Sequence, residues 1–130
     1  MFAGGIVTVF VTDMDRSVRF YTEQLGLRLL QRFANAFATI DGGHGLTIGL
    51  HPVDSAGPAA APKTGLAIGL YLTGGMRDAV SALRDRGVSV GPPIVDEDVG
   101  VFSYFTDPDG NSLYVAELTA AHLRAAAGLR

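Results

Sequence analysis

The sequence predicts an α+β fold made of two modules, each with the order strand, helix and three strands (βαβββ). Each half of the chain begins with a β-branched stretch, continues with apolar residues at helical spacing, and ends with three short extended runs. Both helical segments stop at a glycine, and these glycines, Gly26 and Gly87, lie 61 residues apart. Val18 and Val80, which hold matching places in the two helices, lie 62 residues apart. The second half is therefore expected to repeat the first.

The first half opens with a strand over residues 5–12, in which Val7, Val9 and Val11 share one face. Asp13 is placed to cap a helix whose apolar residues recur at spacings of three, four and seven. Gly26 ends this helix in a position that favours a left-handed residue. The remaining strands of this half are expected over residues 27–33, 36–40 and 46–50.

The second half follows a segment rich in proline, alanine and glycine that has no hydrophobic period. It contains a strand over residues 66–72, a helix over 75–86, a proline-interrupted edge strand over 88–95, and a hairpin of strands 101–106 and 112–117. An alanine-rich helix is expected after it. The whole chain is interpreted as a single domain, with module one at 4–51, a connector at 52–63, module two at 64–118 and a C-terminal helix at 119–130.

The hairpin turn lies within residues 105–115 (FTDPDGNSLYV) and has specific turn chemistry. Asp107 is expected to accept a backbone hydrogen bond, and Pro108 fixes the next dihedral angle. Gly110 and Asn111 are the residue types that best tolerate a positive φ. Leu113 and Val115 then return to a hydrophobic layer with a period of two.

Composition excludes several classes of function. Of the 130 residues, 48% are hydrophobic and 18% are charged, so the chain is expected to fold around a real core. The net charge of −3, with scattered Lys and Arg, argues against nucleic acid as a partner. The absence of cysteine excludes disulfides, thiolate nucleophiles and cysteine-based metal sites. No apolar run is long enough to span a membrane and no signal peptide is apparent, so a cytoplasmic location is expected.

Two motifs resemble one known family. Residues 11–21 (VTDMDRSVRFY), the Leu25-Gly26-Leu27 stretch and residues 105–111 (FTDPDGN) are similar to the vicinal-oxygen-chelate superfamily. This superfamily includes glyoxalase I, extradiol dioxygenases, and the fosfomycin- and bleomycin-resistance proteins. The resemblance implies a U-shaped, eight-stranded sheet around a cleft, usually in a homodimer.

The same resemblance locates the positions where the family's enzymes hold a metal. One ligand lies on the first and one on the last strand of each module, and the motif spacing carries these positions to Ile6, Gly49, Ile68 and Tyr114. The first three cannot bind a cation, and Tyr114 is an uncommon ligand. The two first strands contain no His, Asp, Glu, Asn or Gln. We therefore expect no metal and no other cofactor, because an ion would depend on residues such as His51 and Glu117.

The alternation of residues along the strands predicts an apolar, aromatic cleft wall. Its predicted members are Ile6, Thr8, Phe10, Gly49, His51, Ile68, Leu70, Phe102, Tyr104 and Tyr114. The candidate ligand-binding residues among them are Thr8, Phe10, His51, Phe102, Tyr104 and Tyr114. Two alternatives stay open, namely that these side chains fill the cleft as core and that His51 is only a solvated residue at a strand end. No catalytic residue is identified, and residues 96–98 are either a cation-attracting rim or a solvated acidic loop.

These observations favour a metal-free protein that sequesters a hydrophobic or aromatic small molecule, such as an antibiotic. The alternative is a glyoxalase-like lyase, isomerase or dioxygenase with a non-standard metal site. A metal-free enzyme and a module regulated by a partner also remain open. Neither nucleic acid nor a membrane is an expected partner, whereas a second copy of the chain is.

Overall fold

The computed structural model describes residues 1, 5–53 and 66–120. The chain divides into two units, and each is described by itself. Unit 1 comprises Met1–Lys63 and Asp107–Asn111, and unit 2 comprises Thr64–Thr106 and Ser112–Arg130. Both units contain the predicted βαβββ order, which confirms the α+β fold class.

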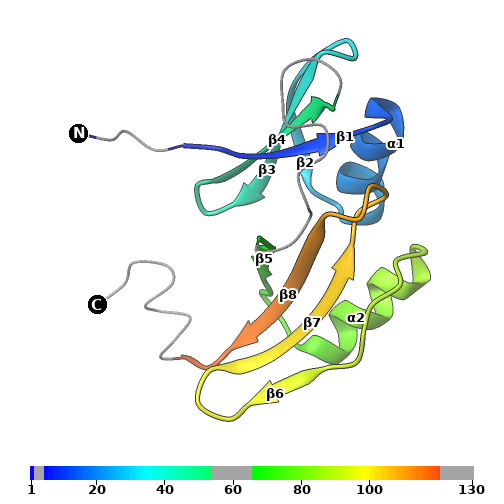
Figure 1. The fold of residues 1–130 in the computed structure, drawn as a ribbon. Coiled ribbons are helices and arrows are strands. Elements are labelled where there is room, and N and C mark those ends of the chain that lie inside the picture. Colours follow the sequence, from blue (N-terminus) through cyan, green and yellow to red (C-terminus); the bar gives the residue numbers. More distant parts are fainter. Residues whose placement is uncertain (2–4, 54–65, 121–130) are drawn as a thin grey trace. The chain divides into compact units, whose positions relative to one another are not determined.

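Unit 1 consists of one mixed sheet and one helical segment (Figure 1). Its elements are β1 (Val7–Val11), α1 (Met14–Arg19), the π-helix η1 (Phe20–Gln24), β2 (Arg28–Phe33), β3 (Phe37–Gly43) and β4 (Leu46–Pro52). The strand order in the sheet is β1-β4-β3-β2, with β1 parallel to β4 and the other pairs antiparallel. The core lies between the sheet and α1, where Val11, Ile40, Ile48 and Leu50 are almost completely buried.

Unit 2 repeats this arrangement, with one regular α-helix in place of α1 and η1. Its elements are β5 (Ile68–Tyr71), α2 (Met76–Asp85), β6 (Ile94–Asp96), β7 (Gly100–Thr106) and β8 (Ser112–Leu118). The strand order is β5-β8-β7-β6, with β5 parallel to β8. Phe105, Leu113 and Val115 are buried on the face that α2 covers, together with Met76 and Leu83 of the helix.

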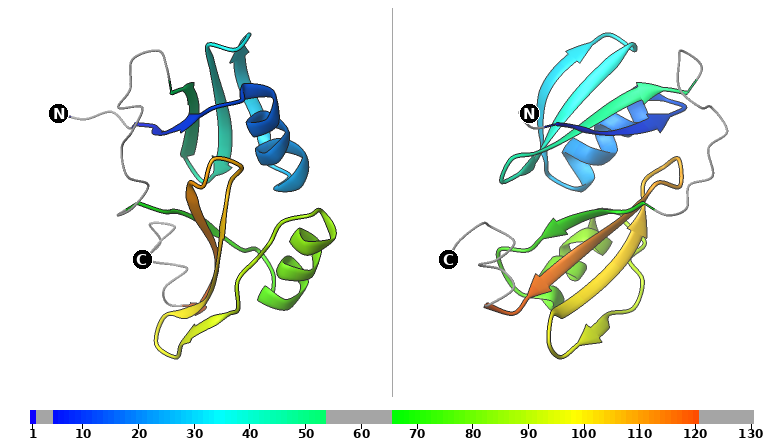
Figure 2. Two further views of the ribbon diagram at one scale, coloured as in Figure 1. Left: turned by 45° about the vertical axis from the view of Figure 1, so that its right-hand side comes forward. Right: turned by 60° about the vertical axis from the view of Figure 1, so that its left-hand side comes forward.

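In each unit the helix covers only one face of its own sheet (Figure 2). The side chains that alternate with the core residues therefore project from the other face, which carries no helix of that unit. These uncovered faces are where ligand-binding residues were predicted. Among the described residues, no helix is both long enough and apolar enough to cross a membrane.

Several local predictions need correction. Residues 88–90 form no strand, because the Val88 N–H donates to the Leu83 carbonyl of α2 (3.0 Å) and the Val90 carbonyl accepts from the Arg84 side chain (3.1 Å). Gly91 donates its N–H to the Tyr104 carbonyl of β7 (2.8 Å), but the two prolines that follow it cannot donate to a ladder. The first helix changes to π geometry after Arg19, and Leu25 N–H donates to the Phe20 carbonyl. The strands β3 and β4 run further than predicted, and Pro52 belongs to β4 instead of the connector. Most of the connector and residues 121–130 of the predicted C-terminal helix lie outside the described residues.

Candidate functional site

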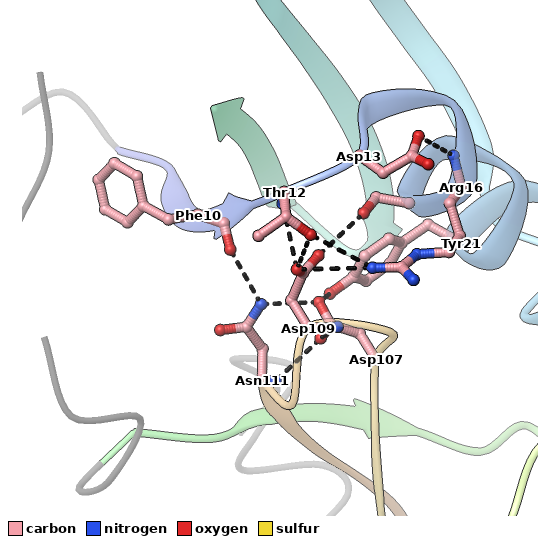
Figure 3. A network of polar contacts seen from close by, with 9 residues as sticks. Phe10, Thr12, Asp13, Arg16, Tyr21, Asp107, Asp109 and Asn111 are labelled. Atoms are coloured by element: carbon pink, nitrogen blue, oxygen red, sulfur yellow. Dashed lines mark hydrogen bonds and ion pairs between the residues drawn. The ribbon is translucent and has the colours of Figure 1, made fainter. Parts of the chain in front are cut away.

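The two sequence motifs meet in unit 1, in a polar network centred on two buried carboxylates (Figure 3). Asp107 is 4% exposed, and its carboxylate accepts four hydrogen bonds. One carboxylate oxygen accepts from the backbone N–H groups of Asp109 (2.9 Å) and Asn111 (2.8 Å). The other accepts from the Asn111 side-chain amide (2.8 Å) and the Tyr21 hydroxyl (2.9 Å). Asp107 thus holds both the turn and the helical segment.

This geometry refines the prediction for the turn. Gly110 has the expected positive φ of 80°, but Asn111 is not among the described residues with positive φ. Asn111 instead uses its side chain, which donates to Asp107 and, at 3.4 Å, to the Phe10 carbonyl. Burial, and then the Asp107 carboxylate, raise the pKa of Tyr21 above its ordinary value, so this hydroxyl remains a donor.

Asp109 anchors the start of the helical segment. Its side chain is 3% exposed and accepts from the Thr12 backbone N–H (3.1 Å) and the Thr12 hydroxyl (2.5 Å). The Ser17 hydroxyl donates to it at 3.4 Å, and the Arg16 guanidinium lies 3.7 Å away. Asp13 caps α1 as predicted by accepting from Arg16 N–H. Because the carboxylates of Asp107 and Asp109 are occupied within the protein, we interpret this network as structural.

The uncovered face of the unit 2 sheet carries a cluster of aromatic rings. Its members, named here the tyrosine face, are Tyr71, Phe102, Tyr104 and Tyr114. The Tyr104 and Tyr114 rings are tilted at 45° with centroids 5.2 Å apart, and Phe102 meets Tyr114 edge-on at 5.9 Å. Tyr104 pairs directly with Tyr114 across β7 and β8. The Phe102, Tyr104 and Tyr114 rings attract one another at these distances. Tyr71 projects from the same face of the sheet, because it has the same parity in β5 as Gly69, the partner of Tyr114.

The tyrosine face is open to solvent in spite of its aromatic composition. Tyr71 is 49% exposed and Tyr104 is 47% exposed. Tyr114 is half-buried between its neighbours. Burial, followed by the neighbouring Tyr71 and Tyr104, raises the pKa of Tyr114, so its hydroxyl stays protonated at neutral pH. The tyrosine face therefore offers aromatic surface together with the protonated hydroxyl of Tyr114.

Two residues that the sequence analysis assigned to the cleft side lie on the opposite face of this sheet. Ile68 pairs with the fully buried Leu113, and Leu70 pairs with the buried Val115, so both project toward α2. The cleft-wall prediction was wrong for Ile68 and Leu70 because the register of β5 was misplaced by one residue. The residue of β5 that pairs with Tyr114 is Gly69.

Glu117, which was suggested as a residue on which a metal ion would depend, has a different role in the structure. It pairs with Val101 and has the same parity as Leu113 and Val115, which places it on the α2 side. Its Oε1 accepts from the Met76 backbone N–H at 3.3 Å. Because Gly75 provides no side-chain cap, Glu117 satisfies the amino-terminal end of α2.

The uncovered face of the unit 1 sheet carries a smaller cluster. Phe10 pairs with His51 across β1 and β4, and their rings meet edge-on at 5.9 Å. Phe37 approaches His51 from β3 at 6.5 Å. These three residues are named here the histidine face. His51 Nδ1 lies 3.1 Å from the Pro52 carbonyl oxygen, which favours a proton on that nitrogen. Thr8 is exposed and pairs with Gly49 on the same side of the sheet.

The structure therefore divides the predicted ligand-binding residues between two faces. Phe102, Tyr104 and Tyr114 lie together in unit 2, and Thr8, Phe10 and His51 lie together in unit 1. The predicted set did not include Phe37 of the histidine face or Tyr71 of the tyrosine face. Tyr71 has the same parity as Gly69, so a correct register of β5 identifies it. Phe37 has the opposite parity in β3 to the buried Ala38 and Ile40, and this alternation places it on the uncovered face of the sheet.

A depression of about 480 Å³ in unit 1 has no member of either aromatic cluster in its lining. It is lined by Val11, Thr12, Asp13, Met14, Asp15, Asn35, Pro52 and Val53. Its carboxylates already have partners, because Asp13 caps α1 and Asp15 pairs with Arg32. Across the described part of the chain, three or more His, Cys, Asp or Glu side chains nowhere gather in a group that could hold a metal ion.

Comparison with known proteins agrees with the motifs. A model of the Glyoxalase/Bleomycin resistance protein/Dioxygenase superfamily matches residues 5–115. An antibiotic-binding protein from Streptomyces sp. CB03234 is similar in structure, with a TM-score of 0.72, 24% identity, and coverage of 92% of this chain and 98% of that chain. A superfamily member from Sphaerobacter thermophilus is also similar, with a TM-score of 0.72, 25% identity, and coverage of 90% of this chain and 98% of that chain. For lactoylglutathione lyase from Agrobacterium tumefaciens, the TM-score is 0.71, the identity is 18%, and the coverage is 88% of this chain and 92% of that chain. The curated proteins gave no match.

Proposed function

Because the chain belongs to the Glyoxalase/Bleomycin resistance protein/Dioxygenase superfamily, we propose that it is a binding protein that sequesters a planar, uncharged aromatic molecule on its tyrosine face. The observation that carries this function is the exposure of aromatic rings on a face that the helix of this unit does not cover. Tyr71 and Tyr104 each leave about half of their surface open, as a stacking surface for a ligand requires.

The charges of unit 2 favour an uncharged ligand. Its described basic residues, Arg77, Arg84 and Arg86, lie on α2 or at its end, and α2 covers the opposite face of the sheet. Among the described residues of unit 2, an anionic ligand on the tyrosine face would thus find no cationic partner to compensate its lost hydration. The tyrosine hydroxyls can instead donate hydrogen bonds to carbonyl or ether oxygens at the edge of a flat ligand.

The histidine face is proposed as a second, smaller contact surface. Phe10 and His51 supply edge-on rings, and Thr8 adds a hydroxyl on the same side of that sheet. The antibiotic-binding neighbour illustrates that the fold can hold an antibiotic, and an antibiotic with an aromatic system is one ligand of the proposed class. At 24% identity that neighbour supports the fold only, so the aromatic contacts of this chain carry the assignment.

The test uses tyrosine fluorescence, because the chain has four tyrosines and no tryptophan. Naphthalene-2-carboxamide should quench this fluorescence on binding, whereas naphthalene-2-carboxylate, which differs by its negative charge, should bind much more weakly. Tyr114→Ala should weaken binding of the amide by ~1–3 kcal/mol through lost stacking and burial. Val95→Ala is the control, because Val95 is an exposed apolar residue of β6 that pairs with Val101 and so lies on the opposite face of the same sheet.

Metal analysis separates this function from the glyoxalase-like enzyme. Protein purified without chelator should contain no stoichiometric Zn, Ni, Mn or Fe, and EDTA should leave its melting temperature unchanged. One equivalent of bound metal would favour the enzymatic alternative. Failure of both naphthalene probes and of a wider panel of polycyclic compounds to quench tyrosine would contradict the binding function.

A further inference from the structure

We propose that Gly69 is a positioning residue of the tyrosine face, because its lack of a side chain lets the Tyr114 ring lie against β5. This role rests on the function proposed above for that face. Gly69 does not have the left-handed φ that requires glycine. The reason for glycine at this position is therefore spatial.

The geometry around Gly69 is specific. A Cβ atom at this position would overlap Cζ and Oη of Tyr114 and would lie 2.7 Å from its Cε2. The phenol end of the ring thus occupies the volume that any other residue at position 69 would fill. Because this is the free end of a side chain, the ring can swing away. A methyl group at position 69 should therefore displace the ring and leave the backbone in place.

Displacing this ring would change the whole tyrosine face. Tyr114 is the central member of the cluster, because it contacts both Tyr104 at 5.2 Å and Phe102 at 5.9 Å. Its raised pKa, caused first by burial, agrees with a hydroxyl that is packed against the strand. A ring held in this orientation offers a ligand a fixed surface, whereas a displaced ring would have to be reordered on binding.

Unit 1 supplies an internal comparison. The pair that corresponds to Gly69 and Tyr114 is Thr8 and Gly49, in which the glycine lies on the last strand instead of the first. A Cβ atom at Gly49 would meet Ile6 Cδ1 at 2.9 Å and Thr8 Oγ1 at 3.3 Å, so no aromatic ring lies nearest to it. The same substitution at the two glycines thus separates ring positioning from a general effect of alanine in a strand.

The experiment compares Gly69→Ala, Gly49→Ala, Tyr114→Ala and the double variant Gly69→Ala/Tyr114→Ala. Naphthalene-2-carboxamide should bind Gly69→Ala about fivefold more weakly than wild type, as expected from a lost stacking contact. Gly49→Ala is the control in the free protein, where it should leave the Tyr114 ring in place. In the Tyr114→Ala background, Gly69→Ala should have no further effect, because the ring through which it acts is absent.

A second readout needs no ligand. With 3-fluorotyrosine incorporated, the ¹⁹F signal of Tyr114 in the free protein should move in Gly69→Ala, and the signal of the buried Tyr21 should not. If Gly69→Ala lowers the melting temperature, Tyr114→Ala should restore it. An unmoved Tyr114 signal would overturn the positioning role, as would an effect of Gly69→Ala that persists undiminished without Tyr114. Failure of the probe to bind wild type would instead contradict the proposed function, and the free-protein signal would still decide the role of Gly69.

Discussion

Tyr21 is fully buried, and its hydroxyl donates to the Asp107 carboxylate at 2.9 Å. Burial, and then the Asp107 carboxylate, raise the pKa of Tyr21 in the folded state above the ordinary value near 10. The unfolded chain therefore loses this proton first as the pH rises. The stabilising contribution of the protonated hydroxyl is complete below pH 10 and decreases above it.

This linkage predicts that the free energy of unfolding falls above about pH 10, with a slope approaching 1.4 kcal/mol per pH unit for one released proton. Tyr21→Phe should be less stable at neutral pH, because the Asp107 oxygen loses a donor, and should show a smaller alkaline slope. Urea unfolding at a series of pH values measures both. Equal alkaline slopes for wild type and Tyr21→Phe would refute this prediction.

Ser103 presents the opposite case, a buried hydroxyl without a partner. It lies on the α2 side of β7, opposite Val115, and its Oγ has no hydrogen-bond partner among the described residues. Leaving such a group unsatisfied costs about 1–3 kcal/mol. Ser103→Ala should therefore raise the free energy of unfolding by up to about 1 kcal/mol, since the alanine also loses a small packing contact.

Ser17 is the matched control for this substitution. It is equally buried, but its hydroxyl donates to Asp109. Ser17→Ala should lower stability, so the two serine-to-alanine changes are expected to differ in sign. Chemical denaturation compares them, and a clear loss of stability in Ser103→Ala would show that its hydroxyl is satisfied in solution.

Among the elements, α2 depends on a residue distant in the sequence. Gly75 offers no side-chain cap, and Glu117 of β8 accepts from the Met76 N–H instead. Glu117→Ala should therefore destabilise the protein by about 1 kcal/mol, the usual effect of removing a cap. Glu117→Gln keeps the acceptor and should lose only the favourable charge at the helix terminus, about 0.3–1 kcal/mol. In thermal unfolding, the wild type should have the highest melting temperature, Glu117→Gln an intermediate one and Glu117→Ala the lowest. An unchanged melting temperature of Glu117→Ala would exclude the capping role.

The elements also show how far the sequence could predict the structure. The two βαβββ modules, the Asp13 cap and most strand positions followed from hydrophobic periodicity and turn chemistry. The faces of β5 could not be predicted, because residues 67–71 are apolar, aromatic or glycine at both parities. Only the pairing of Gly69 with Tyr114 decides which of them project from the tyrosine face.

The position of Glu117 in the structure, by contrast, could have been predicted from the sequence. Glu117 shares its parity with Leu113 and Val115, so its position on the α2 side follows from the alternation of β8. The change from α1 to η1 had no such signal, because the apolar spacings of residues 14–25 fit both helix types. The buried acceptor role of Asp107 toward Tyr21 joins residues 86 positions apart, which local patterns cannot reveal.

At the scale of the whole molecule, exposed apolar strands argue for assembly. Leu29, Leu30 and Phe33 are exposed on β2, and Ile94 and Val95 are exposed on β6. Both strands are edges of their sheets, and exposed apolar edges tend to pair or become covered. The homodimer thus remains a prediction, with an expected mass of about 27 kDa, twice the 13.6 kDa of one chain. Sedimentation velocity at micromolar concentration tests it, and a species of monomer mass would contradict it.

The central claim is that an uncharged aromatic ligand binds on the tyrosine face, and ¹⁹F NMR of protein labelled with 3-fluorotyrosine tests it most directly. Four signals are expected, one from each of Tyr21, Tyr71, Tyr104 and Tyr114. Saturation with naphthalene-2-carboxamide should shift the Tyr104 and Tyr114 signals and leave that of the fully buried Tyr21 in place. Signals of Tyr104 and Tyr114 that stay unchanged while the amide binds would place the ligand elsewhere and contradict the claim.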